Sequence, residues 1–327
     1  MIPSAKPGML IPILLTLSSC LGLKGTQQKV LHDKSYCNQQ VTFNYTEKEL
    51  PTPTYKLEID PLLKERLSFQ SLKTANAIGL VDLLTQYVGS LSSYGKNPTL
   101  VEKINIIDLS VKINQTINNS SLEVSAVASK LDCEEERAAQ FAYYLKEKED
   151  NTENKLIIGS IIIAAAGAIA EEATADTPEG RNAASGIVIG SSLVGATLGV
   201  LMLTNKKSIE FQHPVNPLKD IWENPVVSNY YPPSVWYYLT HVNPDNNQKS
   251  LAKLLVEKWM LFGQTKDVKD KTRDETYALF FGEGGKYSSA QLKIRADMLD
   301  QVEAYVTLMK QDLRTLSSEI ENLYTEK

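Results

Sequence analysis

A long heptad repeat near the C-terminal end constrains the fold of this chain more than any other feature. One set of seam positions carries Leu292, Leu299, Val306, Leu313 and Ile320, and the other carries Arg295, Val302, Met309, Leu316 and Leu323. Nine of these ten positions are apolar, which predicts one helix with a single apolar seam. Ser288-Ser289-Ala290-Gln291 has the spacing of a helix cap at its start. Because the chain contains other long helices against which this one can pack, we expect it to lie antiparallel in its own bundle rather than in an intermolecular coiled coil.

A second long helix is predicted upstream. Thr99-Leu100-Val101-Glu102 has the spacing of a capping box and follows the helix-breaking run Gly95-Lys96-Asn97-Pro98. Apolar residues then recur at helical spacing to about Asp150; they are Ile106, Leu109, Ile113, Ile117, Val124, Val127, Leu131, Phe141 and Leu145. The polar run 114–121 is compatible with a kink or an interruption. Two helices of such length predict a bundle of long antiparallel helices.

Residues 20–94 divide at Asp60-Pro61, which supplies an N-cap and a first-turn proline. After it, an amphipathic helical run is predicted to continue to the Gly95 break. Its apolar residues are Leu63, Leu67, Ile78, Leu83 and Leu91. Before it, two alternating patterns predict short strands; they are Val41, Phe43 and Tyr45, then Tyr55, Leu57 and Ile59.

The region 208–287 is rich in aromatic residues and broken by prolines. The aromatic residues include Trp222, Tyr230, Tyr231, Trp236, Tyr237, Tyr238 and Trp259. The prolines limit helices in the first part of this region to short pieces. We therefore expect a compact cap on the bundle. Core packing is favoured over a ligand groove or a membrane-interface belt.

Two uncharged apolar stretches, 156–170 and 183–204, flank a polar connection and predict a helical hairpin. Small residues recur in both and would let helix backbones approach closely; the glycines are Gly159, Gly167, Gly186, Gly190, Gly195 and Gly199. Burial in the protein or in an oligomer interface is the favoured interpretation. The alternative is entry into a membrane, since the order of elements resembles that of helical pore-forming toxins in outline. The first stretch would span only about 22 Å, which is short for a hydrocarbon core of ~30 Å.

The N-terminal segment has the pattern of a secretion signal. Lys6 precedes an apolar run from Met9 to Leu17, which ends in Leu17-Ser18-Ser19-Cys20. These four residues resemble the lipobox of bacterial lipoproteins. The resemblance implies a signal peptide of residues 1–19, cleavage between Ser19 and Cys20, and a lipid on the Cys20 thiol. It also implies a cell-envelope protein at the periplasmic face of the outer membrane, because no acidic retention or export cue follows Cys20.

The other two cysteines, Cys37 and Cys133, form an even pair once Cys20 carries a lipid. An oxidising compartment favours a disulfide between them, and two buried free thiols are the alternative.

Composition and motifs argue against several function classes. The net charge of −5 predicts no nucleic-acid partner, since phosphate binding needs a basic face. His32, His213 and His241 lack metal-ligand spacing, so we expect no metal and no cofactor. The run 281–286 is rich in glycine but lacks the P-loop pattern, which favours a turn. With no nucleophile motif either, we expect that the chain is not an enzyme.

Together these patterns predict a mainly α protein with minor β structure. The expected segments are the signal (1–19), a lipidated tether (20–54), a long-helix region (55–150), the apolar hairpin (151–207), the aromatic cap (208–287) and the heptad helix (288–327). The expected function is binding or assembly in the envelope. The expected partners are a membrane, through Cys20 and the hairpin at 156–204, and a protein or a second copy of the chain. A membrane-inserting pore protein and an envelope enzyme are the alternatives.

Overall fold

The structure, a computed structural model, describes residues 42–95, 97–174, 207–213, 215–242, 249–261 and 271–325. Side chains are described up to residue 151 in helix α5 (Leu100–Thr174) and from residue 275 onward in helix α10 (Lys271–Phe281). The chain divides into two compact units, Met1–Gln39 and Gln40–Lys327. The first unit lies outside the described residues.

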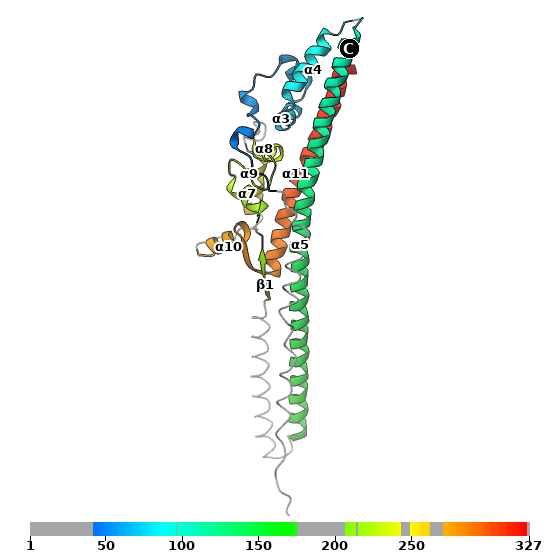
Figure 1. Ribbon diagram of the computed structural model, residues 1–327. Helices are drawn as coiled ribbons and strands as arrows, with labels where there is room; N and C mark the ends of the chain where they lie inside the picture. Colours follow the sequence, from blue (N-terminus) through cyan, green and yellow to red (C-terminus); the bar gives the residue numbers. More distant parts are fainter. Residues whose placement is uncertain are drawn as a thin grey trace, which may run out of the picture. The chain divides into compact units, whose positions relative to one another are not determined.

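The second unit is mainly helical and is built on two long helices. Helix α5 (Leu100–Thr174) and helix α11 (Ser289–Thr325) pack extensively against each other. They run in opposite directions, as Figure 1 shows. Ser289 at the start of α11 donates to Glu149 Oε2 at 3.1 Å, while Ile320 near its end packs in one cluster with Ile106 near the start of α5. The predicted antiparallel packing of the heptad helix within its own chain is confirmed.

The start of each long helix is capped as predicted. The Glu102 carboxylate accepts from the backbone N–H of Thr99 at 2.7 Å, and the Glu102 N–H donates to the Thr99 hydroxyl at 3.3 Å. The same reciprocal pattern links Ser288 and Gln291 before α11. Both boxes satisfy backbone donors that the first helical turn leaves free.

Helix α5 differs from the prediction at two points. It is continuous through residues 114–121, where most polar side chains face outward and Thr116 Oγ1 donates to Lys112 O at 3.0 Å. It also does not end near Asp150. The helix continues to Thr174, for 75 residues and about 110 Å in all. Residues 151–155 are polar but contain neither proline nor glycine, so nothing in them stops the helix.

The predicted amphipathic run after Asp60 is three helices instead of one: α2 (Pro61–Arg66), α3 (Phe69–Ala77) and α4 (Val81–Ser93). The Asp60 carboxylate caps α2 as predicted, accepting from Leu62 N at 2.8 Å. Ser68 then caps α3 by accepting from Ser71 N. Gly79 ends α3 with a φ of +67°, a backbone conformation that glycine adopts without strain. The helical pattern therefore predicted the type of structure correctly, but the breaks between the three helices depend on single residues, Ser68 and Gly79.

The two strands predicted before Asp60 are wrong. Two short 3₁₀ turns, η2 (Glu47–Glu49) and η3 (Thr54–Lys56), stand in this region. Phe43 donates its N–H to Asn229 O at 3.0 Å, which is a loop contact rather than part of a strand ladder. The alternating pattern instead reflects single side chains that are buried in the hydrophobic clusters, as Tyr45 and Ile59 are. Val41 lies outside the described residues. Burial without a neighbouring strand produces the same period of two.

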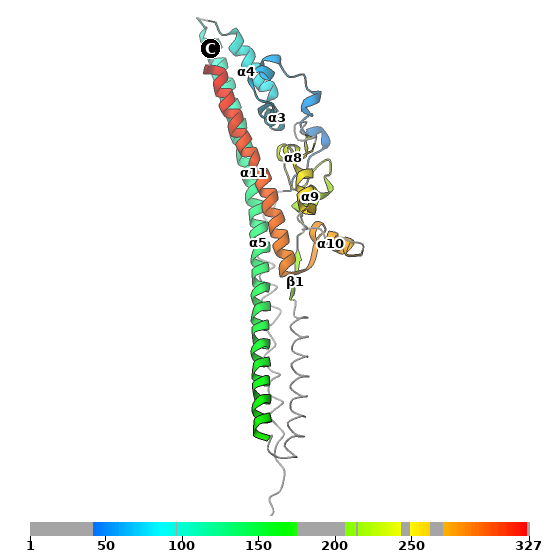
Figure 2. The ribbon, with the colours of Figure 1, turned by 180° about the vertical axis from the view of Figure 1, so that it is seen from behind.

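In its described residues, the cap region has a two-stranded antiparallel sheet and four short helices. Strand β1 (Ser208–Gln212) pairs with β2 (Gly284–Ser288), so that Phe211 lies opposite Gly285. The helices are α7 (Pro217–Glu223), α8 (Pro233–Thr240), α9 (Leu251–Leu261) and α10 (Lys271–Phe281). Prolines occupy the first turns of α7 and α8, as the predicted limit on helix length requires. The sheet packs against α11, where β2 leads directly into that helix (Figure 2).

Two hydrophobic clusters fill the unit. The aromatic core joins β1, β2 and α7–α10 to the middle of α5 and to α11 as far as Leu313. The aliphatic core joins α2–α4 to the start of α5 and to the end of α11. Both clusters therefore use the same pair of long helices. Trp236, Trp259, Tyr230 and Tyr231 are fully buried in the aromatic core, which confirms core packing for them.

Candidate functional site

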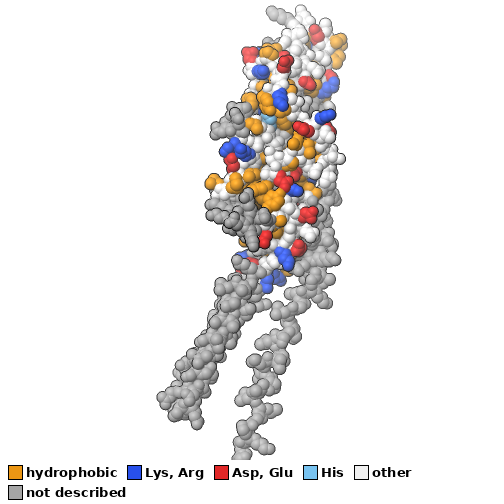
Figure 3. All heavy atoms as spheres, turned by 90° about the vertical axis from the view of Figure 1, so that its left-hand side faces the viewer, with side chains coloured by type: hydrophobic (Ala, Val, Ile, Leu, Met, Phe, Trp, Pro, Cys, Tyr) orange, Lys and Arg blue, Asp and Glu red, His pale blue; other side chains and the backbone are white. Residues whose placement is uncertain are grey.

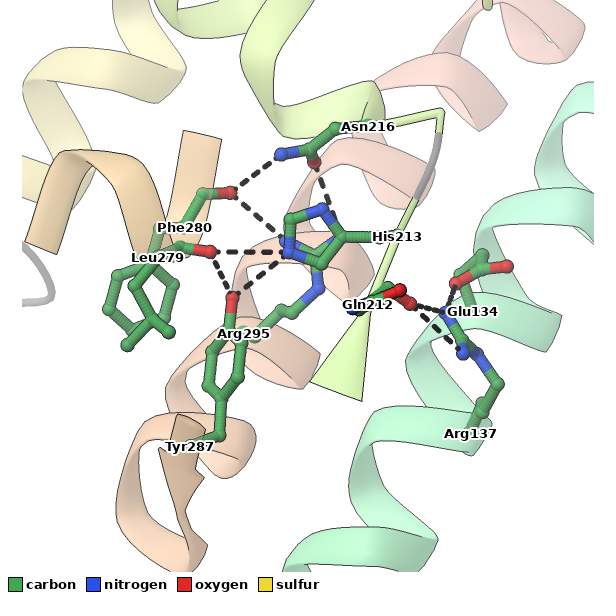
Figure 4. A network of polar contacts seen from close by, with 9 residues as sticks. All are labelled: Glu134, Arg137, Gln212, His213, Asn216, Leu279, Phe280, Tyr287 and Arg295. Carbon is green, nitrogen blue, oxygen red and sulfur yellow. Dashed lines mark hydrogen bonds and ion pairs between the residues drawn. The ribbon is translucent and has the colours of Figure 1, made fainter. Parts of the chain in front are cut away.

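Arg295 is the one polar residue in the heptad seam, and the structure buries it completely on α11. Its Nη1 donates to Phe280 O at 3.0 Å and its Nη2 donates to Asn216 Oδ1 at 3.2 Å (Figure 4). Burial lowers the pKa of Arg295, while nearby Tyr287 and Glu134 act in the opposite direction. A buried guanidinium needs hydrogen-bond partners, and here the cap supplies them.

Asn216, just before α7, continues this network. Its Nδ2 donates to Phe280 O at 2.8 Å and to Gly282 O at 3.0 Å, so the Phe280 carbonyl accepts from both Asn216 and Arg295. Gly282 closes α10, and a Cβ at this position would lie 2.3 Å from Ala278 O. Only glycine fits that approach. The predicted turn at 281–286 is therefore a helix end followed by strand β2, and its Gly282 carbonyl accepts from the Asn216 side chain.

His213 lies beneath the same turn. Its Nε2 is 3.2 Å from Leu279 O and 3.1 Å from the Tyr287 hydroxyl, and that hydroxyl donates to Leu279 O. Burial, followed by the nearby Arg295 charge, lowers the pKa of His213 to about 2. The imidazole is therefore neutral at ordinary pH, and within the described part of the chain its Nδ1 has no hydrogen-bond partner.

Glu134 and Arg137 attach the network to α5. Arg137 Nη2 forms an ion pair with Glu134 Oε2 at 2.6 Å, and the two guanidinium Nη atoms lie 3.4 Å from Gln212 O. The Arg137 Cζ atom also lies 4.3 Å from the centre of the Phe211 ring. A cation over an aromatic face adds attraction beyond the hydrogen bonds. These contacts hold β1 against the long helix.

The chemistry open to this network follows from its burial. Arg295 is 0% exposed and His213 is 1% exposed, so neither side chain meets solvent. The bonds of Arg295 and Asn216 go to the chain's own carbonyls and to each other. General acid–base or electrostatic catalysis needs groups that face a substrate. The network instead joins α5, β1, α7, α10 and α11 into one body.

A second polar cluster joins α3 and α8 to α11. Asp312 Oδ2 accepts from the Tyr238 hydroxyl and from Gln70 Nε2, each at 2.5 Å. Lys73 Nζ lies 5.2 Å from the centre of the Tyr238 ring, and burial lowers its pKa while Asp312 opposes that change. The lysine is 2% exposed, which leaves it no access to a ligand. This cluster also serves packing.

His241 lies between two tyrosine rings at the edge of this body. Its ring stacks on Tyr237 at a centroid distance of 4.6 Å and on Tyr55 at 6.5 Å. Burial lowers its pKa to about 4, with the Lys73 charge as the second cause. A cavity of about 340 Å³ lies beside it and is lined mainly by apolar and aromatic side chains, among them Phe69 and Leu72.

The surface offers a different kind of site. At the start of α5, four large apolar side chains share one exposed face; they are Leu100 (73% exposed), Ile104 (56%), Ile107 (62%) and Val111 (47%). Spacings of four, three and four residues place them on one line of a helix. We call this face the α5 stripe. The buried residues of the same segment, Ile106, Leu109 and Ile113, lie on the opposite face. The prediction of α5 considered only the buried set, although the second set is visible in the sequence.

A groove of about 740 Å³ borders the α5 stripe. Ile107 and Val111 belong to both, and the groove is also lined by Tyr87 of α4 and Tyr324 of α11. The stripe and the apolar part of the groove lie side by side between the ends of three helices, although Lys103, Asn114 and Glu321 also line the groove. Contiguous exposed apolar surface of this kind marks interaction sites in folded proteins. The face that carries the cap, by contrast, mixes apolar side chains with charges of both signs (Figure 3).

The residues predicted as sites fall mostly outside the description. Cys20, Ser19 and Cys37 lie before residue 42, and Gly186, Gly190, Gly195 and Gly199 lie between residues 175 and 206. Gly159 and Gly167 lie within α5, so the first apolar stretch is part of that helix rather than a separate element. Cys133 lies on α5. Since the other two cysteines are outside the described residues, its pairing with Cys37 stays a prediction.

The described residues contain neither a candidate metal site nor a candidate membrane-spanning helix. Among them, no group of three or more His, Cys, Asp or Glu side chains is placed to hold a metal ion. Within the same ranges, no helix is both long enough and apolar enough to cross a membrane.

Comparison with known proteins adds no relative. No protein-family model, no curated protein and no solved structure matches the chain.

Proposed function

We propose that this chain is a lipid-anchored protein of the bacterial cell envelope that acts by binding or assembly rather than by catalysis. The observation that carries the binding role is the α5 stripe, where four large apolar side chains remain between 47% and 73% exposed on one helix face. Burying such a face against a partner gains hydrophobic free energy that the isolated chain does not realise. The buried polar networks are consistent with a role other than catalysis, because their side chains bond to other groups of the chain and do not face a substrate.

The binding role is tested by cross-linking in intact cells, comparing the parent with Ile107→Glu. Ile107 is 62% exposed, so the change should leave folding intact and remove the cross-linked species. Val226→Glu is the matched control, since Val226 is 61% exposed in the cap. Cross-linked species that persist unchanged in Ile107→Glu would contradict a binding role for the stripe.

The lipid anchor rests on the Leu17-Ser18-Ser19-Cys20 resemblance. Cys20→Ala should abolish labelling by a radioactive fatty acid and leave the precursor uncleaved, because the peptidase acts on the modified cysteine. The parent should remain with the outer-membrane fraction after a carbonate wash. Retention of mature-sized, labelled protein in the variant would show that another residue carries the lipid.

The proposed Cys37–Cys133 disulfide would close a loop of roughly 95 residues and could stabilise the folded chain by about 4–5 kcal/mol on the chain-entropy argument. Peptide mapping without reduction should recover the two cysteines in one linked fragment. Recovery of Cys37 as a free thiol would contradict the pairing.

Membrane insertion by residues 156–204 is the second candidate function. One observation favours it: the first apolar stretch continues α5 without a break, so a membrane-entering segment would be joined rigidly to the body. Release of a trapped dye from vesicles of envelope lipids would support this role. Vesicles that stay sealed at high protein-to-lipid ratio would contradict membrane insertion and leave binding as the only proposed function.

A further inference from the structure

We propose that the α5 stripe docks on the α5 stripe of a second copy of this chain, with the two helices parallel. This inference rests on the proposed binding function and names its partner. The spacings of four, three and four residues assign Leu100 and Ile107 to one heptad seam position and Ile104 and Val111 to the other. A two-fold symmetric pair needs a surface that is complementary to itself, and a straight apolar line meets that need.

The charges beside the stripe favour the parallel arrangement. Lys103 flanks it on one side and Asp108 on the other, five residues further along, and both are exposed. In a parallel pair, a residue on the first flank faces the residue five positions later on the second flank of the other helix. Lys103 of each copy therefore faces Asp108 of the other. An antiparallel pair would bring together residues of the same flank, and these opposite charges would not meet.

The charges already present on α5 do not prevent this contact. Asp108 accepts from Lys112 at 2.7 Å within the helix, and both side chains are 55% exposed. An exposed pair of this kind is weak, and a carboxylate can accept from more than one donor. Lys103 borders the groove, where Ile107 and Val111 supply the apolar contacts.

The contact is short. Beyond Val111 the same two seam positions carry Asn114 and Asn118, both exposed, so the apolar line covers about three helical turns, or about 16 Å. Such a contact falls below the ~1,200 Å² of ordinary stable interfaces. The pair should therefore be weak and depend on concentration. Anchoring both copies in one membrane would raise their effective concentration and favour it.

Charge reversal on the full-length mature chain, held in dodecyl maltoside micelles, tests the arrangement. Lys103→Glu places a carboxylate opposite Asp108 in both contacts, and Asp108→Lys places an ammonium opposite Lys103. Two contacts change from attraction to repulsion, so the dissociation constant of each variant should rise roughly fivefold to thirtyfold. A mixture of the two variants restores opposite charges at both contacts and should dimerise like the parent.

Fluorescence-detected sedimentation across a concentration series measures these constants. Ile107→Glu should remove the dimer, and Val226→Glu should leave it unchanged. The proposal is overturned if the parent stays monomeric, or if the variants dimerise as well as the parent does. It is also overturned if the mixture fails to recover, because pairing between residues 103 and 108 of the two copies would then not explain the loss in the single variants. Cross-linking of Ile107 to a different envelope protein in cells would preserve the binding function while contradicting self-association.

Discussion

The two cores of this molecule share α5 and α11 but are held together by different means. The aliphatic core consists mainly of leucine, isoleucine and valine side chains from α2–α4 and the outer ends of the two long helices. The aromatic core combines large rings with buried polar groups, and Arg295, His213 and Asn216 all bond inside or beside it. Apolar packing depends on volume and burial, whereas the polar network also requires that each donor meet its acceptor.

This difference has a consequence for how each core tolerates change. An aliphatic core accepts substitutions that preserve volume, because its contacts have no direction. In the aromatic core, removal of one polar partner leaves others buried without a hydrogen bond. The two cores should therefore respond differently to substitutions of similar size.

Arg295→Ala should have the largest effect. The change leaves Phe280 O and Asn216 Oδ1 without the bonds that the guanidinium makes at 3.0 and 3.2 Å, and it opens a cavity at a fully buried position. The free energy of unfolding should fall by about 4 kcal/mol. Urea denaturation followed by tryptophan fluorescence measures it.

Arg295→Met is the matched control, because it keeps most of the volume while it removes the hydrogen bonds and the charge. It should cost less than the alanine change but remain clearly destabilising. If methionine restored full stability, the seam would need volume alone, and the proposed contrast between the two cores would be lost.

Leu316→Ala makes the corresponding change in the aliphatic core. Leu316 is fully buried on α11, six turns beyond Arg295, and it packs against apolar neighbours. Its truncation should cost about 3 kcal/mol through lost burial and the cavity left behind. Leu316→Met should recover most of this loss. A methionine variant as unstable as the alanine variant would show that this core also depends on precise shape.

His213 should make the stability of the aromatic core depend on pH. Its pKa is about 2 in the folded chain and 6.5 ordinarily, so below pH 6.5 the unfolded chain binds a proton that the folded chain does not. The stabilisation is complete above pH 6.5 and falls by about 1.4 kcal/mol per pH unit below it, to a loss of about 2 kcal/mol at pH 5.

His213→Gln keeps a donor near the Leu279 carbonyl and cannot titrate. Denaturant curves between pH 4.5 and 8 should show a shallower decline for this variant than for the parent. Parallel curves for the two proteins would mean that His213 is protonated in the folded chain or accessible to water.

Two tryptophans give the smallest and most direct comparison. Trp236 and Trp259 are both fully buried in the aromatic core. Trp236 Nε1 lies 3.2 Å from Pro225 O and from Val226 O, whereas within the described residues Trp259 Nε1 has no hydrogen-bond partner. Trp236→Phe should therefore cost about 1 kcal/mol more than Trp259→Phe. Equal losses, measured by thermal unfolding, would assign both effects to ring volume.

Sequence patterns predicted the long helices well because their information is local and repeated. The seam from Leu292 to Leu323 needs only periodicity, and the capping boxes at Thr99 and Ser288 need only residues three positions apart. The same reasoning failed where a single residue determines where a helix begins or ends, as Ser68 and Gly79 do in dividing one predicted helix into three. It failed again before Asp60, where burial of Tyr45 and Ile59 imitated the period of a strand.

The sequence by itself determined the helical class, the pairing of the heptad helix with another helix of the chain, and the position of the one charged seam residue, because each depends on spacing along the chain. Only the tertiary structure decided what Arg295 binds. Its partners, Asn216 and Phe280, are 79 and 15 residues away along the chain, and no local pattern connects them. The exposure of the α5 stripe was decided in the same way, because a helix with two apolar faces shows which one is covered only when its neighbours are in place.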